Sequence, residues 1–137
     1  MNEESCIFCK IIKNEIPSNK IFEDDKSLAF LDIFPINEGH TIVIPKEHFK
    51  NIEEIPLNEL SRVFSTVKKT AILLHKKLNI GGYNILQNNY KPAGQVIEHF
   101  HIHIIPRNEN DEKIKLEIPI NQASEEDLNN ILKRVRD

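Results

Sequence analysis

The run His99-Phe100-His101-Ile102-His103-Ile104-Ile105-Pro106 alternates imidazole and apolar side chains before it ends in two apolar residues and a proline. Successive side chains of a β-strand point to opposite faces, so a strand would place the three histidines in one row and the apolar side chains on the other face. Alternate residues of a strand lie roughly 6.6 to 6.8 Å apart, so neighbouring rings can flank one substrate group or reach one ion. The run therefore predicts a strand that carries a functional site.

The chain has 137 residues without a Gly/Ser linker or an internal repeat, and we expect one domain over residues 1–137. Its core should span residues 5 to about 107, followed by a more polar C-terminal extension over residues 108–137. The net charge of -3, with interspersed signs, argues against a nucleic acid polymer as partner. We also expect no membrane partner and a cytoplasmic location, because no apolar run approaches ~20 residues and the polar N-terminus carries no signal-peptide pattern.

The hydrophobic patterns predict an α+β order of elements. One long amphipathic helix that ends at Gly81-Gly82 is predicted by a stripe at three and four residue steps: Leu57, Leu60, Val63, Phe64, Val67, Ala71, Leu74 and Leu78. A short helix is expected over residues 6–13, and a last helix should follow the N-cap Ser124. Strands are expected over residues 21–23, 27–31, 40–44, 83–87 and 96–105. We expect the helices to cover one face of the sheet.

The histidine row is compatible with three kinds of site. Two histidines spaced by one residue on a strand can bind zinc, and a catalytic zinc would need a third ligand such as His103 or His40. A neutral imidazole can instead attack phosphorus or a carbonyl. The flanking imidazoles and the backbone N–H groups near Gly94 and Gln95 would then be the donors to a phosphate. A binding module without turnover is the third alternative.

Cys6 and Cys9 are the two cysteines of the chain, and their spacing lets two thiolates share one zinc ion. A closed tetrahedral site needs two further ligands, and without another cysteine these must be histidines. The chain offers six: His40, His48, His75, His99, His101 and His103. A reduced, metal-free pair stays open as an alternative. A thioredoxin-like redox motif would need a βαβ unit, which the pattern around the pair does not predict.

The order of motifs along the chain resembles the histidine triad (HIT) family of nucleotide hydrolases and transferases. The segment Gly94-Gln95-Val96-Ile97-Glu98-His99-Phe100-His101-Ile102-His103-Ile104-Ile105 is similar to that family's alternating signature. The likeness covers nearly the whole chain up to about Arg107. Upstream it includes Cys6-Ile7-Phe8-Cys9, Ile21-Phe22-Glu23-Asp24, Leu28-Ala29-Phe30-Leu31-Asp32, and Gly39-His40 leading to Ile44-Pro45-Lys46. The implied fold is an antiparallel sheet of about five strands with one long helix, a short N-terminal helix and a C-terminal helix.

The resemblance implies a covalent nucleotidyl-histidine intermediate. The middle histidine of the family attacks the α-phosphorus of a nucleotide, so the implied nucleophile is His101. The implied donors that position the phosphate and assist the leaving group are His103 and His40. The implied nucleotide site has Asp32 at the ribose and Ile33 and Phe34 near the base, and it is completed by Asn88, Gly94, Gln95, Val96, His101 and His103.

Asn88 and Asp32 resemble the phosphoramidase-like branch of the family more than the branch that hydrolyses dinucleoside polyphosphates. The implied substrate is a purine nucleoside phosphoramidate or a related nucleotide conjugate, with a dinucleoside polyphosphate as the alternative. Val96 departs from the family, which usually has a Ser or Thr hydroxyl here that contacts the phosphate or the departing group. A lost charge-assisted hydrogen bond costs about 1.5 to 3 kcal/mol, so a nucleotide-binding regulatory protein with marginal turnover is a further alternative.

A zinc-bearing, bacterial-type branch of the family resembles this chain in its cysteine pair. That likeness implies one structural zinc per chain, with Cys6, Cys9, His48 and His99 as ligands. His99 would then tie the N-terminal segment to the strand that carries His101. The family usually pairs through its long helix and a strand, which implies a symmetric homodimer.

Overall fold

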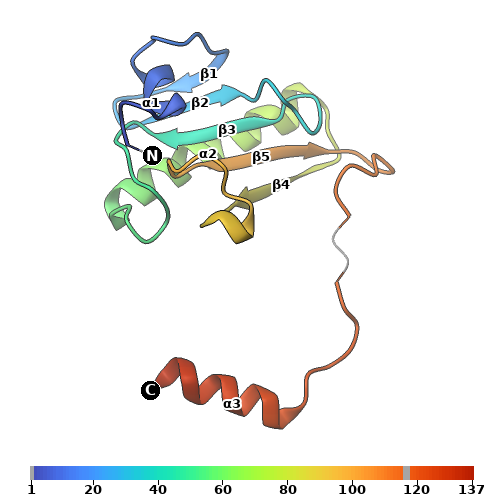
Figure 1. Ribbon diagram of the computed structural model, residues 1–137. Coiled ribbons are helices and arrows are strands. Elements are labelled where there is room, and N and C mark those ends of the chain that lie inside the picture. The colour runs from blue at the N-terminus through green and yellow to red at the C-terminus, as the bar shows by residue number, and fades with distance from the viewer. Residues whose placement is uncertain (1, 116–117) are drawn as a thin grey trace.

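Five antiparallel strands form one sheet in the computed structural model, which describes residues 2–115 and 118–137. The strands are β1 (Lys20–Glu23), β2 (Ser27–Leu31), β3 (Thr41–Pro45), β4 (Gly82–Gln87) and β5 (Ile102–Arg107). Their order across the sheet is β1-β2-β3-β5-β4, as Figure 1 shows. Ile42 of β3 lies opposite His103 of β5, so residues just before β3 lie near the histidines. The expected α+β fold with a five-stranded antiparallel sheet is confirmed.

The long helix α2 (Leu57–Lys77) covers one face of the sheet. Its buried apolar residues pack against strand residues of that face: Val63, Val67, Ala71 and Leu74 against Ala29, Val43, Ile102 and Ile104. Ile102 and Ile104 are fully buried, and burial of each contributes about 1.5 to 3 kcal/mol. The apolar residues of the histidine run therefore face the core beneath α2.

The short helix α1 (Ile7–Ile12) packs on the opposite face, so the expectation that the helices cover one face is wrong. Phe8, Cys9 and Ile11 contact side chains that alternate with those beneath α2: Leu28, Phe30, Ile42 and Ile44. The reason is that the side chains of the neighbouring strands β2 and β3 are buried on both faces of the sheet over most of the length of each strand. A strand buried on both faces needs a cover on each side.

The histidine strand begins later than expected, at Ile102 instead of residue 96. The amide of Phe100 donates to the carbonyl of Phe49, 2.6 Å away, and not to a neighbouring strand. Upstream, the short 3-10 helix η1 (Lys91–Ala93) keeps the chain in a loop. His99 and His101 therefore lie on the segment that leads into β5, and His103 lies in the strand itself.

The stripe of the long helix also differs from the expected one. Leu57, Phe64 and Leu78 are exposed, whereas Thr66 and Thr70 take buried positions. Thr66 is tolerated there because its hydroxyl lies 2.6 Å from the hydroxyl of Ser27. These exposed residues leave apolar surface uncovered along the long helix.

The last helix, α3 (Glu125–Arg136), begins where Ser124 predicts it. The Ser124 hydroxyl accepts a hydrogen bond from the amide of Asp127 at 3.1 Å, which caps the first turn. None of the residues of α3 is buried, and Figure 1 shows the helix standing away from the sheet. Among the described residues, no helix combines the length and the apolar character needed to cross a membrane.

Candidate functional site

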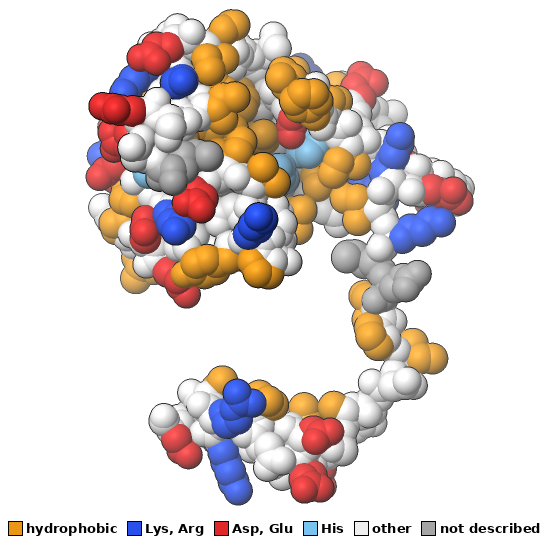
Figure 2. All heavy atoms as spheres, in the orientation of Figure 1, with side chains coloured by type: hydrophobic (Ala, Val, Ile, Leu, Met, Phe, Trp, Pro, Cys, Tyr) orange, Lys and Arg blue, Asp and Glu red, His pale blue; other side chains and the backbone are white. Residues whose placement is uncertain are grey.

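A cleft of about 410 Å³ opens on the face of the sheet that carries α1. Its walls come from segments far apart in the sequence: α1 with Ile7, Phe8 and Ile11, the loop after β2 with Asp32, Ile33 and Phe34, and the loop before β5 with Gly94 and Val96. His101 and His103 also line it. Figure 2 shows apolar side chains gathered around histidines on the facing side of the molecule. The cleft is thus mostly apolar with a few imidazoles, which is typical of a small-molecule site.

The ring of His101 is oriented by the backbone. Its Nδ1 lies 2.7 Å from the carbonyl oxygen of His99. A carbonyl only accepts, so Nδ1 carries the proton and Nε2 carries the lone pair. The Phe8 ring packs against the imidazole in a T-shaped arrangement, at a centroid distance of 5.2 Å, and restricts its rotation. His101 is therefore held in the tautomer that a nucleophilic imidazole requires.

His40 and His103 form a hydrogen-bonded pair beside it. The amide of Ile36 donates to Nδ1 of His40 at 3.0 Å, so the proton of a neutral His40 lies on Nε2. This Nε2–H donates to Nδ1 of His103 at 2.9 Å, which leaves Nε2–H of His103 as the remaining donor. Asp32 Oδ2 lies 3.6 Å from Nε2 of His40 and adds a negative charge.

Burial lowers the pKa of the imidazoles in the cleft. It takes the pKa of His103 to about 4, helped by the positive charges that His101 and His40 would carry. Burial also lowers the pKa of His40 and of His101, opposed at both by the negative charge of Asp32. The rings are therefore neutral at neutral pH, and the lone pair of His101 is available.

The loop between β2 and β3 is shaped by Asp32 and Gly39. Asp32 Oδ1 accepts from the amide of Phe34 at 2.8 Å in a tight turn, which leaves Ile33 and Phe34 74% and 83% exposed at the rim of the cleft. Gly39 has a φ of +86°, and a Cβ there would lie 2.5 Å from Leu78 Cδ1. Glycine thus lets the loop enter β3 with His40 turned toward His103.

Two backbone amides of the loop before β5 are engaged within the protein. The amides of Gly94 and Gln95 donate to the carbonyls of Lys91 and Tyr90, at 2.9 and 3.2 Å, so these two are not free to donate to a phosphate in this conformation. The side chain of Gln95 also bonds within the protein, to the amide of Tyr90 and to the carbonyls of Lys50 and Ile97.

Gly94 and Val96 of this loop, together with Asn88 just before it, were also expected in the nucleotide site. Gly94 lines the cleft with a φ of +96°, a value that favours glycine. Val96 lines the cleft and is 84% exposed. Asn88 lies against Gly94 but is not among the residues that line the cleft.

Cys6, Cys9, His48 and His99 come together behind the cleft, with one donor atom of each within 4.8 Å of the others. His99 Nδ1 lies 3.4 Å from Cys6 Sγ and 3.5 Å from Cys9 Sγ, and His48 Nδ1 lies 3.3 Å from Cys9 Sγ. Tetrahedral zinc with ordinary bond lengths separates sulfur and nitrogen ligands by about 3.6 Å. His99 also donates Nε2–H to the carbonyl of Pro45 at 2.9 Å, which frees Nδ1 to bind a metal. This group could hold a metal ion.

The chemistry of this donor set fits a soft divalent metal. Burial, followed by the hydrogen bond and the charge of Cys6, raises the pKa of Cys9 to about 12, so the thiol is protonated without a metal. Burial lowers the pKa of His99 to about 4, which keeps its imidazole neutral as a ligand. Two thiols and two neutral imidazoles are a common set for structural zinc, which deprotonates the thiols when it binds.

A second group of possible ligands, Asp32, His40 and His103, lies in the cleft itself. Its geometry differs, because His40 and His103 are 2.9 Å apart and share a hydrogen bond. Two imidazole ligands of a tetrahedral zinc would be separated by about 3.3 Å. The arrangement fits a proton-sharing pair better than a metal site, which disfavours the alternative of a zinc-dependent reaction.

The sequence did not indicate several residues of the site. Phe8 packs against both His99 and His101, and Ile7, Ile11 and Ile16 line the apolar end of the cleft. The position of Phe8 between the two cysteines was the one available signal. No sequence signal could have pointed to Ile36, because its contribution is a backbone N–H group, which nearly any residue supplies.

Comparisons with known proteins found related sequences and structures. The HIT domain family model matches residues 13–110. An uncharacterized HIT-like protein of Methanocaldococcus jannaschii is 47% identical over 131 residues, 96% of this chain and 98% of that protein. An adenosine 5'-monophosphoramidase of Candida albicans is 50% identical over 107 residues, 75% of this chain and 70% of that protein. The structure of a zinc-bound histidine triad family protein from Mycobacterium smegmatis matches with a TM-score of 0.78 at 33% identity, over 86% of each chain.

Proposed function

Because the chain belongs to the HIT domain family, we propose that it is a nucleotide-binding hydrolase that cleaves at the α-phosphate of a purine nucleoside phosphoramidate or a related nucleotide conjugate. The observation that carries the proposal is the orientation of His101. Its Nδ1 donates to the carbonyl of His99, so Nε2 is the nucleophilic nitrogen at the cleft. The Candida albicans relative, which is named an adenosine 5'-monophosphoramidase, supports the choice of substrate class.

The nucleotide would lie with its base at the apolar end of the cleft. Ile11, Ile16 and Phe30 line that end, and Ile33 and Phe34 form its exposed rim. A purine buries its flat faces against such side chains. Asp32 lines the cleft with Oδ2 3.6 Å from His40 Nε2, and its carboxylate would accept hydrogen bonds from ribose hydroxyls. The α-phosphate would then reach His101 and His103.

In the proposed reaction, His101 Nε2 attacks the α-phosphorus as the bond to the leaving group breaks. His103 Nε2–H donates to the phosphate or to the leaving group, and His40 holds His103 in that tautomer. Water then hydrolyses the nucleotidyl-histidine. The leaving group takes up a proton that comes from solvent by way of the His40–His103 pair, whose protonated form the negative charge of the bound phosphate favours. The attacking water later returns one proton to solvent, so the rings end each turnover as they began.

We propose one structural zinc per chain, bound by Cys6, Cys9, His48 and His99. The site would join α1 to His99, whose carbonyl orients His101. The ion would act on the nucleophile indirectly, through this backbone contact and through Phe8, which packs against the rings of both His99 and His101. The zinc-bound Mycobacterium smegmatis structure supports the choice of metal.

The proposal includes a homodimer formed through β4 and α2. β4 is an edge strand of the sheet, and a groove of about 400 Å³ beside it is lined by Phe64, Ile72, Tyr83 and Ile85, among others. These four side chains are 39 to 43% exposed. A second copy would cover the groove and pair with the edge. Sedimentation should find the chain as a dimer and Ile85→Asp as a monomer, and a monomeric parent at every concentration would contradict the dimer.

A different candidate, a nucleotide-binding regulatory protein with marginal turnover, is favoured by one observation. Val96 stands at the cleft without a hydroxyl to offer to the substrate. Both candidates bind nucleotide, so they differ in rate. The rate of the parent enzyme therefore distinguishes them.

Steady-state kinetics test the proposed function. Rates would be measured on adenosine 5'-phosphoramidate, a diadenosine polyphosphate and a nucleotidyl sugar, with parent, His101→Ala and His75→Ala proteins. His75 is an exposed histidine of α2 and serves as the matched control. We expect the phosphoramidate to be the best substrate and His101→Ala alone to lose turnover while it still binds AMP. A parent that binds AMP but cleaves none of the three would support the regulatory protein.

A further inference from the structure

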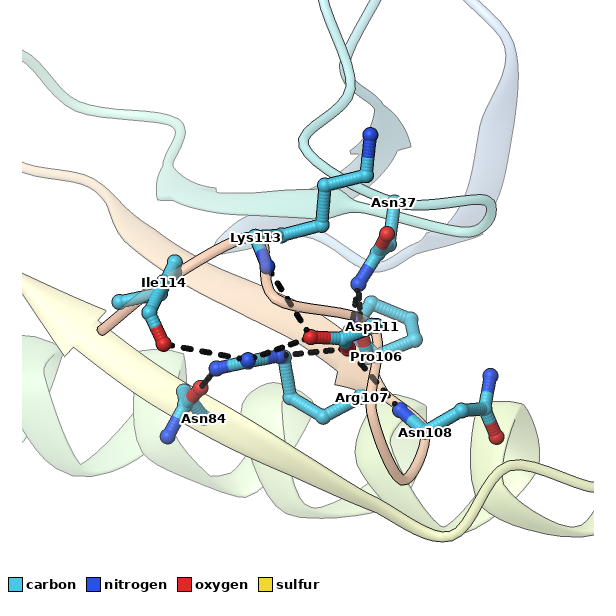
Figure 3. A network of polar contacts seen from close by, with 8 residues as sticks. All are labelled: Asn37, Asn84, Pro106, Arg107, Asn108, Asp111, Lys113 and Ile114. Carbon is cyan, nitrogen blue, oxygen red and sulfur yellow. Dashed lines mark hydrogen bonds and ion pairs between the residues drawn. The ribbon is translucent and has the colours of Figure 1, made fainter.

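Asp111, four residues beyond the end of β5, is the centre of a dense polar network (Figure 3). Its carboxylate pairs with Arg107 at two points, through Nε at 2.9 Å and Nη2 at 2.7 Å. The amides of Asn108 and Lys113 also donate to it, at 3.0 and 3.2 Å. The Arg107 guanidinium, with these amides, holds the pKa of Asp111 well below its usual range. Asp111 is therefore an ionised acceptor throughout the neutral range.

Asn37 connects this network to the cleft. Its Nδ2 donates to Asp111 Oδ2 at 3.0 Å and to the carbonyl of Pro106 at 2.9 Å. The amide of His40 donates to the carbonyl of Asn37, also at 3.0 Å. The neighbouring Ile36 supplies the amide that fixes the tautomer of His40. The side chain of Asn37 thus anchors the backbone that holds His40.

The network continues on its other side, through Arg107. Arg107 Nη1 donates to Asn84 Oδ1 of β4 at 2.8 Å, and Nη2 to the carbonyl of Ile114 at 3.3 Å. Arg107 is itself the last residue of β5, the strand that carries His103. Asn37, Arg107 and Asp111, here named the Asp111 clamp, therefore join the loop of His40 to the strand of His103.

We propose that the Asp111 clamp is a positioning element for the proposed reaction: it holds the loop of His40 against the end of β5 so that His40 meets His103 at hydrogen-bond distance. This inference rests on the proposed function. Asn37 and Asp111 do not line the cleft, so they act through His40 and not on the substrate. The clamp affects the step that the His40–His103 pair assists, the departure of the leaving group.

The clamp predicts a dependence on the leaving group. An amine needs a proton in order to leave, whereas p-nitrophenolate leaves without one. A shift of His40 should therefore slow cleavage of adenosine 5'-phosphoramidate by about ten- to a hundred-fold. Cleavage of the p-nitrophenyl ester of AMP should change less than about two-fold, because attack by His101 remains intact. KM should stay near the parent value on both substrates.

Asn37→Ala is the main variant, because it removes both side-chain hydrogen bonds and leaves the Asp111–Arg107 pair in place. The matched control is Asn84→Ala, which removes one hydrogen bond of Arg107 on the side away from His40. We expect the control to keep the leaving-group dependence of the parent. Asp111→Asn, nearly isosteric but uncharged, is the second variant if Asn37→Ala does not fold.

Histidine side-chain ¹⁵N NMR gives a readout without substrate. We expect a protonated Nε2 and an unprotonated Nδ1 for His40 in the parent, and a mixture of tautomers for His40 alone in Asn37→Ala. Equal loss on both substrates with a lower melting temperature and an unchanged His40 signal would overturn the clamp and leave it a structural role. Parent rates on both substrates would also overturn it. A parent that cleaves neither substrate would refute the proposed function, and the His40 signals would still test the clamp.

Discussion

Val96→Thr should make the protein a faster hydrolase. Val96 stands at the cleft with His101 and His103, and 84% of its surface is exposed. Threonine has nearly the shape of valine and adds one hydroxyl. Because the position is exposed, the free energy of unfolding should change by less than about 0.5 kcal/mol.

The size of the gain follows from the same exposure. A hydrogen bond to a charged phosphate oxygen contributes about 1.5 to 3 kcal/mol. At Val96 water competes with the hydroxyl, so the lower end of this range applies. About 1.4 kcal/mol corresponds to a ten-fold change, so kcat/KM should rise about ten-fold. If the hydroxyl bonds only to the departing group in the transition state, the gain is in kcat.

The assay compares parent, Val96→Thr and Val96→Ala on adenosine 5'-phosphoramidate, with melting curves for all three. Val96→Ala removes the methyl groups without adding a donor and should keep the parent rate. If Val96→Thr and Val96→Ala have the same kcat/KM, the hydroxyl makes no contact with the reacting group, and the placement of the phosphate next to Val96 is wrong.

Three further predictions follow from the site. Cys6→Ser should lower the zinc content from one ion per chain to less than about half, because a closed tetrahedral site needs all four ligands. Elemental analysis after dialysis measures the zinc content, and a content equal to that of the parent would contradict the ligand set. Burial lowers the pKa of His101, so kcat/KM should stay constant from pH 8 to about 6.5 and fall only at lower pH, as His101 gains a proton. A pH profile of kcat/KM with its midpoint above 6.5 would contradict a buried, neutral nucleophile. Asp32→Asn keeps an oxygen that can accept from the amide of Phe34 but loses the negative charge. The KM should therefore rise about ten-fold for a ribonucleotide and little for a 2',3'-dideoxynucleotide. An equal rise in KM for both substrates would argue against a contact between Asp32 and the ribose.

The same pKa values set the direction of stability against pH. His103 has a pKa of about 4 in the folded chain and an ordinary value near 6.5 when unfolded. Between these values the unfolded chain binds more protons, so the free energy of unfolding falls as the pH drops from 6.5 toward 4. The acid loss of activity should therefore be measured with a stability control at each pH.

The elements of the fold were predictable where the pattern is local and periodic. The stripe through Val63, Val67 and Leu74 predicted α2, and the N-cap Ser124 predicted the start of α3. The start of β5 was not predictable, because it depends on the carbonyl of Phe49 taking the amide of Phe100 out of the ladder. The face of the sheet on which α1 packs was not predictable either. It depends on the burial of β2 and β3 on both faces, which follows from the packing of the whole sheet.

The candidate site likewise combines features that the sequence predicts with features that depend on the folded chain. The residue types and spacing of the histidine run indicated chemistry, and the resemblance grouped Cys6 and Cys9 with His48 and His99, whose donor atoms lie together in the fold. Asn37 and Asp111 gave no signal, because polar residues in turns are common and these two are 74 positions apart. The engagement of the amides of Gly94 and Gln95 also depends on the loop conformation, which no period in the sequence encodes.

The covalent intermediate is the central claim, and mass spectrometry of a quenched reaction tests it most directly. Parent protein mixed with adenosine 5'-phosphoramidate and quenched during turnover should carry one adenylate on the peptide that contains His101, localised to that residue by fragmentation. His101→Ala should carry none and should not turn over. An adenylate on another residue, or His101→Ala that cleaves the substrate as fast as the parent, would contradict the mechanism.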